Sequence, residues 1–372
     1  MQAPPAEVGT SIREIDTPAL IVDLDAFERN LDKMAGIAAA AGVRLRPHAK
    51  THRCSEVARQ QIARGAVGQC VQKVGEAEAL AAGGVGDILV SNQVVGETKL
   101  RRLAALAERT AIALCFDAEA SVEAASRAAA ERGVQIGGLV EIEVGMERCG
   151  VLPGREARDL ARRIADAPGL RFEGLQAYHG GAQHMTGFAE RRAAIDGAIR
   201  AVRETLEMLE ADGLPCPLVG GAGTGTFRLE AASGIYTELQ PGSYAFMDAE
   251  YAGIADEGGG PNREFEHSLF VLTAVMSAGH GRAILDAGLK SYSAEKGLPW
   301  VHGRPGLEVA SASDEHSKLV LGAEDPAFRL GDRVQLIPGH CDPTVNLHDW
   351  YVGVRRGAVE AVWPIDARGA SR

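Results

Sequence analysis

A lysine between two histidines is the residue group in this sequence with the clearest chemical potential. The segment Arg46–His52 reads Arg-Pro-His-Ala-Lys-Thr-His. If the chain is extended here, alternate side chains share one side, so His48, Lys50 and His52 project together. Neighbouring positive charge and partial burial both lower a lysine pKa, and such an amine is suited to forming a Schiff base with a carbonyl. On this motif alone, a solvated lysine at a strand end is an equally good interpretation.

Three further segments combine polar, aromatic and glycine residues. Glu141–Arg148 and Gln176–His184 each follow an apolar run, and Gly220–Thr226 reads Gly-Gly-Ala-Gly-Thr-Gly-Thr. Glycines allow close backbone approach, and successive N–H groups in such a turn can cradle a phosphate. The turn does not fit the Walker A pattern, because no Gly-Lys-Ser/Thr follows it. A lysine, a phosphate-binding turn and aromatic residues on one face together predict pyridoxal 5′-phosphate (PLP) as a cofactor.

A histidine and an aspartate near the C-terminus form a second candidate group. They lie in the segment Pro338–Thr344. In an extended chain His340 and Asp342 share a side, and Cys341 points the other way. A nitrogen and a carboxylate ligand suit a divalent cation that keeps positions open for a hydroxyl group. The competing interpretation is an ordinary His–Asp hydrogen bond in a loop.

The elements that must position these residues alternate in type from Thr17 to about Gly225. Short β-branched runs are followed by Ala/Glu/Arg-rich stretches with helical periodicity. The predicted strands are Ala19–Asp23, Arg44–Ala49, Gly68–Lys73, Asp87–Ser91, Ala111–Phe116, Gly138–Val144, Phe172–Tyr178 and Leu218–Gly220. Eight strand–helix units predict an α/β fold with a (β/α)8 barrel, in which ligands lie over the carboxyl ends of the strands. A doubly wound open sheet is the competing architecture.

The helical pattern ends at a glycine-rich segment, Ala252–Arg263. Beyond it, short runs of strand character are joined by turns that contain glycine. These runs are Leu269–Met276, Arg282–Asp286, Lys318–Leu321, Arg333–Ile337, Tyr351–Arg355 and Ala358–Trp363. We therefore expect a PLP-binding barrel over residues 17–251 and an all-β domain over residues 264–372 that carries the metal ligands. Residues 1–16 are expected to associate with the β domain.

Composition excludes several classes of protein. The chain has 39 basic and 50 acidic residues, a net charge of −11 and no dense basic block, which disfavours nucleic-acid or anionic-membrane binding. The longest nearly apolar run, Leu269–Ala278, is far shorter than the ~20 residues of a membrane span. Met1–Ser11 has no signal-peptide pattern, and the six cysteines lack paired spacing. These features predict a soluble, cytoplasmic protein with free thiols.

With these motifs, the sequence resembles the D-threonine aldolase and D-serine dehydratase group of PLP enzymes, which share the alanine-racemase-like fold. The resemblance extends over nearly the whole chain, from Asp16 to Gly369. The motifs that carry it are Arg46–His52, Gln72–Val74, Gln176–Gly180, Gly242–Tyr244, Met247–Asp248 and Gly339–Thr344.

The resemblance implies roles for individual residues. Lys50 would carry PLP as a Schiff base, Arg148 would face the pyridine nitrogen, and His184 would lie near the substrate hydroxyl. The remaining cofactor contacts would be Gln72, Tyr178, Thr224, Gly242, Ser243 and Tyr251. One departure is Ala222, where relatives often have glycine; its methyl group is expected to be harmless unless the position needs a positive φ. The group also usually forms homodimers.

The metal pair separates the subfamilies. Eukaryotic-type D-serine dehydratases resemble one another in having His-x-Cys here, whereas the aldolases have His-x-Asp. His340 and Asp342 match the aldolase pattern, and Cys341 is out of register. An oxygen ligand favours a hard cation such as Mn²⁺ or Mg²⁺. The expected reaction is retro-aldol cleavage of a β-hydroxy-D-amino acid, best represented by D-threonine, to glycine and an aldehyde.

Several related activities are compatible with the same scaffold and motifs. A D-3-hydroxyaspartate aldolase, which releases glycine and glyoxylate, needs a cation for the second carboxylate, and Arg46 or Arg53 would serve. A D-serine or 3-hydroxyaspartate dehydratase would expel the β-hydroxyl and release a keto acid and ammonia. A racemase or a non-catalytic PLP-binding regulator would leave His340 and Asp342 without a role.

Overall fold

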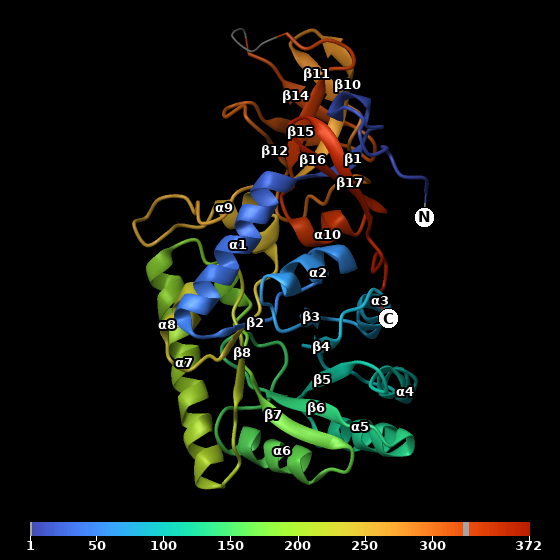
Figure 1. The fold of residues 1–372 in the computed structure, drawn as a ribbon. Helices are drawn as coiled ribbons and strands as arrows, with labels where there is room; N and C mark the ends of the chain where they lie inside the picture. The colour runs from blue at the N-terminus through green and yellow to red at the C-terminus, as the bar shows by residue number, and fades with distance from the viewer. Residues whose placement is uncertain (1, 323–326) are drawn as a thin grey trace.

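The computed structural model describes residues 2–322 and 327–372 and contains two sheets stacked end to end. Figure 1 shows a parallel sheet surrounded by helices in the lower half of the view and a largely antiparallel sheet in the upper half. Helix α10 (Cys341–Val345) lies at the junction between the two halves, next to α2 (Ser55–Ala63). The carboxyl ends of the parallel strands and the second sheet therefore meet in the middle of the molecule.

The parallel sheet has eight strands in the order β2-β9-β8-β7-β6-β5-β4-β3. Its strands are β2 (Arg44–Leu45), β3 (Gln69–Val71), β4 (Asp87–Val90), β5 (Ala111–Phe116), β6 (Ile136–Glu141), β7 (Leu170–Gln176), β8 (Leu218–Gly221) and β9 (Glu238–Leu239). The two ends of this order meet at an isolated parallel bridge between His48 and Cys70. The sheet thus closes into a barrel, as predicted, and the open doubly wound architecture is wrong.

The helices on the barrel form where the sequence supplies caps and an apolar face. In α1 (Leu24–Ala41), the Asp23 side chain accepts a hydrogen bond from the Ala26 N–H, and Gly42 ends the helix with φ +67°. The other helical segments are η1 (Ile12–Glu14), α3 (Val74–Ala82), α4 (Glu97–Leu106), α5 (Glu119–Arg132), α6 (Arg155–Asp166), η2 (Gly181–His184), α7 (Phe188–Ala211), α8 (Phe227–Ala232), η3 (Ser243–Ala245) and α9 (Ala249–Ala252). The buried leucine, valine and alanine side chains of the barrel helices pack on the barrel strands.

The second sheet has nine strands among the described residues, ordered β13-β14-β11-β10-β1-β16-β17 with β15 beside β10 and β12. They are β1 (Ala19–Asp23), β10 (Leu269–Gly279), β11 (Arg282–Leu285), β12 (Trp300–Val301), β13 (Val309–Ala312), β14 (Ser317–Val320), β15 (Arg333–Ile337), β16 (Trp350–Arg355) and β17 (Ala358–Pro364). The N-terminal segment contacts this sheet, since the Gly9 N–H donates to the Val359 carbonyl at 2.8 Å.

Several predicted strands are shifted at their ends by two or three residues, as in β6 and β7, and two predictions need a larger correction. Ala19–Asp23 is a strand with the predicted bounds, but it pairs with β10 and β16 rather than in the barrel. The eighth barrel strand is instead β9, whose two residues are too short to show any periodicity. Residues 19–22 are buried throughout, as a barrel strand would be, so the local pattern is the same in either sheet. The predicted strand Arg44–Ala49 is also too long, because regular pairing ends at Leu45.

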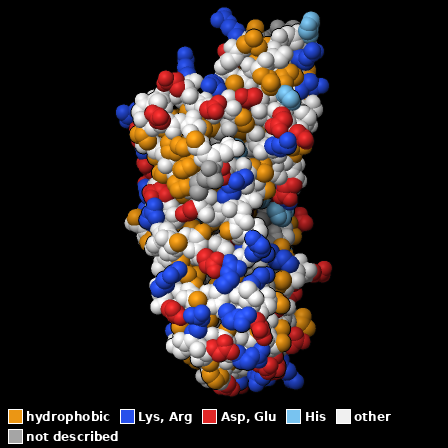
Figure 2. Space-filling model, turned by 90° about the vertical axis from the view of Figure 1, so that its right-hand side faces the viewer, with side chains coloured by type: hydrophobic (Ala, Val, Ile, Leu, Met, Phe, Trp, Pro, Cys, Tyr) orange, Lys and Arg blue, Asp and Glu red, His pale blue; other side chains and the backbone are white. Residues whose placement is uncertain are grey.

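The distribution of charged side chains on the surface (Figure 2) agrees with the lack of a dense basic block in the sequence. Acidic and basic side chains are intermingled over the face shown in Figure 2. Within the described residues, none of the helices combines the length and the apolar character that crossing a membrane requires. All six cysteines are free, as predicted.

We predict that Gly174→Ala disrupts the pairing of β7 with β8. A Cβ atom at Gly174 would overlap the Leu218 carbonyl oxygen, so a shift of the backbone is unavoidable. We expect a loss of more than about 2 kcal/mol in the free energy of unfolding, measured by urea denaturation. The matched control is Gly36→Ala in α1, where a Cβ meets no atom within 4 Å. That change should stabilise the protein by about 0.5–1 kcal/mol, and equal stability of the two variants would contradict the packing described for β7.

Candidate active site

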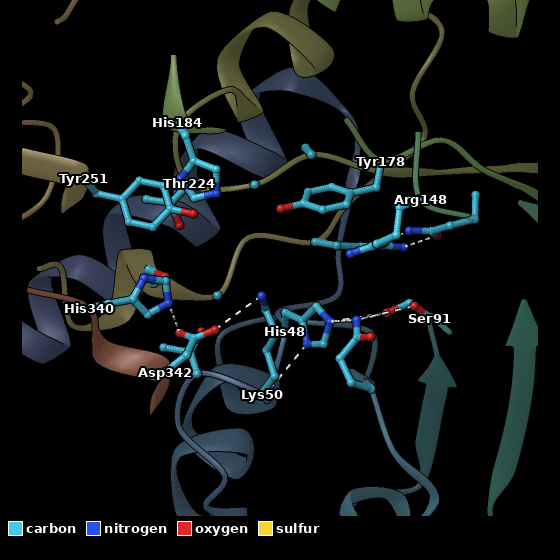
Figure 3. A pocket seen from close by; sticks show the side chains of 18 of the residues that line it. His48, Lys50, Ser91, Arg148, Tyr178, His184, Thr224, Tyr251, His340 and Asp342 are labelled. Carbon is cyan, nitrogen blue, oxygen red and sulfur yellow. Dashed lines mark hydrogen bonds and ion pairs between the residues drawn. The ribbon is translucent and has the colours of Figure 1, made fainter. Parts of the chain in front are cut away.

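A cavity of about 270 Å³ opens at the carboxyl ends of the barrel strands and is lined by residues of both halves. The structure brings every predicted site residue to this one cavity. These are Lys50, Gln72, Arg148, Tyr178, His184, Thr224, Gly242, Ser243, Tyr251, His340 and Asp342. Figure 3 shows that Lys50 and Asp342 point toward each other, with His340, His184 and Tyr251 on one side and Arg148 and Tyr178 on the other. Residues separated by most of the chain therefore share one small volume.

Lys50 lies on a turn and not on an extended strand. The N–H groups of His52 and Arg53 both donate to the Ala49 carbonyl, which curls the chain directly after the bridge at His48. His48 and Lys50 line the cavity, but His52 is fully buried with Nε2 3.4 Å from Gln69 Oε1. The prediction that all three side chains share one side is therefore wrong for His52, because strand alternation ends at the turn.

The environment of Lys50 is also more acidic than its sequence neighbours indicate. Lys50 Nζ lies 3.3 Å from Asp342 Oδ2. The charge of Asp342 raises the pKa of Lys50 and outweighs the opposing effect of burial. The predicted lowering of this pKa is therefore wrong in this structure, because the nearest charged partner comes from the distant end of the chain. Burial and the charge of Lys50 in turn lower the pKa of His48 well below its usual value, which keeps its imidazole neutral.

His340 and Asp342 face the cavity from the start of a helix. His340 is the N-cap of α10, so the extended conformation that we expected for residues 340–342 is wrong. The two side chains nevertheless share a side, with His340 Nε2 3.7 Å from Asp342 Oδ1. Cys341 is buried on the opposite side, where its Sγ lies 3.3 Å from the Met247 carbonyl oxygen. One turn of helix thus produces the side-by-side arrangement that a strand would also have produced.

Asp248 anchors this helix to the barrel half. Its carboxylate is fully buried and accepts hydrogen bonds from the N–H of Tyr251 and the N–H of Cys341, each at 3.0 Å. The same side chain therefore caps α9 and fixes the first residue of α10. Because His340 and Asp342 flank Cys341, Asp248 sets the position of both predicted metal ligands relative to the barrel.

The pair has the properties of an incomplete metal site. Asp342 Oδ1 is buried and has no hydrogen-bond partner among the described residues, and it faces the imidazole nitrogen of His340. A nitrogen and a carboxylate oxygen so placed fit a divalent cation such as Mn²⁺ or Mg²⁺. No group of three or more His, Cys, Asp or Glu ligands occurs in residues 2–322 and 327–372. Two protein ligands leave most of the six coordination positions of a Mg²⁺-like cation to water and substrate.

The carboxylate of Glu250, which the sequence did not indicate as a site residue, contacts both His184 and His340. Glu250 Oε1 lies 2.5 Å from His184 Nδ1, and Glu250 Oε2 lies 2.8 Å from His340 Nδ1. Burial opposes ionisation of Glu250, but the hydrogen bond with His340 and the charge of His184 lower its pKa to about 2. Glu250 comes two residues after the Met247–Asp248 motif. That proximity was the only signal in the sequence, since a lone glutamate on a short helix has no distinctive pattern.

Two backbone segments meet at the opposite end of the cavity. The Tyr244 N–H donates to Thr224 Oγ1 at 3.0 Å, which ties the turn at residues 220–226 to residues 242–244. A Cβ on Gly223 would lie 2.5 Å from Gln183 Oε1, and one on Gly242 would lie 2.8 Å from the His48 carbonyl oxygen. At Gly242 the atom met is backbone, so only glycine permits this approach there. The resulting backbone cradle, with the Thr224 hydroxyl hydrogen free to donate, fits the phosphate of PLP.

The residues expected around a cofactor ring lie between these two ends. The Arg148 guanidinium is 6.0 Å from the centre of the Tyr178 ring and 3.8 Å from Glu141, whose other oxygen accepts from Gln93. The Gln72 amide lies 2.8 Å from His48 Nε2. Glu141 also lines the cavity and was not predicted as a site residue. It provides Arg148 with an acidic neighbour inside the site.

Ala222 adopts a backbone conformation that alanine rarely takes. Its φ is +71°, and the residue is buried beside Gly223 in the glycine-rich turn. The expectation that alanine is harmless here held only if the position did not need a positive φ. Since it does, the alanine carries a backbone strain that glycine would avoid.

Two family models match the chain with the same division. The model described as alanine racemase, N-terminal domain, matches residues 22–250, and the one described as putative serine dehydratase domain matches residues 268–354. The chain is 48% identical to the 3-hydroxy-D-aspartate aldolase of Paracoccus denitrificans strain Pd 1222, with 98% of this chain and 95% of that protein covered. The chain belongs to the D-threonine aldolase and D-serine dehydratase family of the alanine-racemase fold.

Further members of the family support the same assignment. D-threonine aldolase from an Arthrobacter species is 47% identical, with 99% of this chain and 97% of that protein covered. The crystal structure of D-threonine aldolase from Filomicrobium marinum superposes with a TM-score of 0.95 at 47% identity, covering 98% of this chain and 99% of that chain. The predicted α/β fold, a barrel of alanine-racemase type followed by a β domain, is confirmed. At this level of identity to aldolases, the chain is a carbon–carbon lyase.

We predict that Ala222→Gly stabilises the protein. Relief of the left-handed backbone should gain about 1–2 kcal/mol, and the greater freedom of glycine in the unfolded chain should offset about 0.5–1 kcal/mol of it. A higher midpoint of thermal unfolding is expected. The control is Ala161→Gly, a buried position in α6 that does not have a positive φ, which should lower the midpoint. If both substitutions lower it equally, Ala222 is not strained.

Proposed function

We propose that the protein is a PLP- and divalent-cation-dependent aldolase that cleaves a β-hydroxy-D-amino acid, best represented by D-threonine, to glycine and an aldehyde. The observation that carries the proposal is the shared cavity of Lys50, His340 and Asp342, in which an unpartnered carboxylate oxygen faces an imidazole nitrogen. The names of the relatives, D-threonine aldolase and 3-hydroxy-D-aspartate aldolase, support the reaction type.

The cavity offers a holder for each part of PLP. Lys50 would bind the cofactor covalently through its amine, and the segments around Thr224 and Gly242 would hold the phosphate. Arg148 would face the ring nitrogen and keep it unprotonated. When bound, PLP supplies an electron sink for cleavage of the bond next to the substrate's amine-bearing carbon. Gln72, Tyr178, Ser243 and Tyr251 would enclose the ring and phosphate.

The histidine side of the cavity would act on the substrate hydroxyl. A divalent cation held by His340 and Asp342, Mn²⁺ or Mg²⁺, would supply Lewis-acid polarisation there. His184 contacts Glu250 through Nδ1, so its other nitrogen is left to take the hydroxyl proton. Because an arginine at the ring nitrogen weakens the electron sink, help at the hydroxyl matters more than it would beside a ring-nitrogen carboxylate.

The geometry favours an uncharged β-substituent. Neither arginine considered for a second substrate carboxylate is available. Arg46 pairs with Asp87 and Glu238, and Arg53 pairs with Glu76. Among the described residues that line the cavity, the only lysine and arginine are Lys50 and Arg148, which both have cofactor roles. D-3-hydroxyaspartate nevertheless stays the second candidate because of the 48% identity to an aldolase of that name.

A dehydratase, a racemase and a PLP-binding regulator fit the cavity less well. A dehydratase of this group would have a cysteine at position 342, whereas a racemase or a regulator would leave the His340–Asp342 pair unused. The family resemblance supports a homodimer, and six free cysteines support a reducing, cytoplasmic location.

Product analysis tests the reaction type. With PLP and Mn²⁺, D-threonine should yield glycine and aldehyde in equal amounts without ammonia. D-Serine and both 3-hydroxyaspartate diastereomers serve as competing substrates, and D-3-hydroxyaspartate should give a lower kcat/KM than D-threonine. A chelator should abolish cleavage, and Mn²⁺ should restore it. Ammonia and a keto acid as the main products would establish a dehydratase instead.

The assignment of Lys50 is tested by absorbance. The Lys50→Ala variant should lose the visible absorbance of the protein-bound cofactor and all aldolase activity, because no second lysine of residues 2–322 and 327–372 lines the cavity. Lys290→Ala is the matched control, since Lys290 is a surface lysine paired with Glu315, and it should keep both. An unchanged spectrum of Lys50→Ala would refute the assignment.

A further inference from the structure

Among the described residues, Glu250 is the one whose side chain contacts both His184 and His340, two of the three histidines that line the cavity. It lies on α9, and its side chain is only 13% exposed. Its two carboxylate oxygens are divided between the histidines, with Oε1 near His184 Nδ1 and Oε2 near His340 Nδ1. Both imidazole rings thus turn the same nitrogen to Glu250 and line the cavity with the remainder of the ring.

We infer that Glu250 is a positioning residue that sets the tautomer and orientation of His184 and His340 together, so that the Nε2 atoms of both rings serve the substrate hydroxyl and its cation. This inference rests on the proposed function. An ionised carboxylate only accepts hydrogen bonds, so each Nδ1 beside it must carry the proton. The Nε2 lone pair of a neutral imidazole is then available as a metal ligand or as a base.

Contacts other than those of the Glu250 side chain hold α9 against the second half of the molecule. The Ala249 and Glu250 N–H groups donate to the carbonyls of Pro338 and Gly339, which joins α9 to the second half through backbone atoms. The Asp248 carboxylate adds the link to Cys341. Neither contact uses the Glu250 side chain. Its replacement should therefore leave the two halves docked and change mainly the histidines.

The role proposed for Glu250 depends on its hydrogen bonds and not only on its negative charge. Glu295 lies 4.0 Å from the same His340 Nδ1 but is 56% exposed and outside hydrogen-bond distance. Lys296 Nζ lies 3.3 Å from Glu250 Oε1 and compensates part of the charge of Glu250. A glutamine at position 250 would keep one acceptor and place an NH₂ donor against the second histidine. That histidine would have to take the other tautomer or turn away.

The test compares Glu250→Gln with the same change at Glu295, both in the PLP-loaded protein. Mn²⁺ binding is measured by titration with electron paramagnetic resonance, which needs no turnover. We expect Glu250→Gln to weaken Mn²⁺ binding about 10–100-fold, as replacement of outer-shell partners of metal ligands typically does, and Glu295→Gln to bind like wild type. At saturating Mn²⁺, kcat for D-threonine should fall in Glu250→Gln while KM changes little, because the ring of His184 loses the partner that orients it.

Each outcome decides the inference. Wild-type Mn²⁺ affinity and an unchanged kcat in Glu250→Gln would overturn it and leave the proposed aldolase intact. Equal losses in Glu250→Gln and Glu295→Gln would overturn it in favour of a simple charge effect. If the wild-type protein binds no Mn²⁺, the cation of the proposed function and this inference fail together. If Glu250→Gln does not fold, Glu250→Asp decides, since its shorter carboxylate keeps the charge but cannot span both rings; full Mn²⁺ affinity in that variant would overturn positioning.

Discussion

The ion pair between Lys50 and Asp342 is the interaction on which the site depends. It joins an amine at the end of the first barrel segment to a carboxylate at the far end of the chain, 3.3 Å apart. A charged group taken out of water is costly unless a partner compensates it. Among the described residues, Asp342 is the only acidic side chain in an ion pair with Lys50, whereas Asp342 also pairs with His340 of its own half. The docking of α10 on the barrel, held by the buried Asp248, is therefore a condition for having a cavity with this chemistry at all.

From that pair an alternation of charge extends across the cavity. Asp342 is followed by His340, then Glu250, then His184, and each group contacts one of opposite or complementary character. Burial opposes ionisation of Asp342, but Lys50 and His340 hold its pKa far below the usual range. Burial likewise opposes protonation of His340, and its contacts with Asp342 and Glu250 raise its pKa to about 10. These contacts stabilise the protonated form of His340, and a cation bound at Nε2 would replace that proton.

The end of the cavity at Thr224 and Gly242 depends instead on the close approach of backbone segments. Gly242 lies closer to the His48 carbonyl oxygen than a Cβ would allow, and the Thr224 hydroxyl links the turn at residues 220–226 to residues 242–244. Ala222 is held at positive φ within this turn. A strained residue persists only where its surroundings over-determine it. The packing around the turn therefore determines its conformation, and this conformation is unfavourable for Ala222.

The sequence by itself determined those features of this protein that depend on residues close together along the chain. Strand and helix alternation, Lys50 at a strand end, the glycine-rich turn and the His340–Asp342 spacing are all short-range patterns, and the motifs among them identified the family. Tertiary structure decided what depends on distant partners. It placed Ala19–Asp23 in the second sheet, since a buried strand looks alike in either. It raised the pKa of Lys50, because the charge of Asp342 outweighs the effect of burial. It also brought Glu250 between two histidines, a relation that no spacing in one segment encodes. Short-range patterns are set by backbone geometry, whereas the charge around a group is set by whatever the fold packs against it.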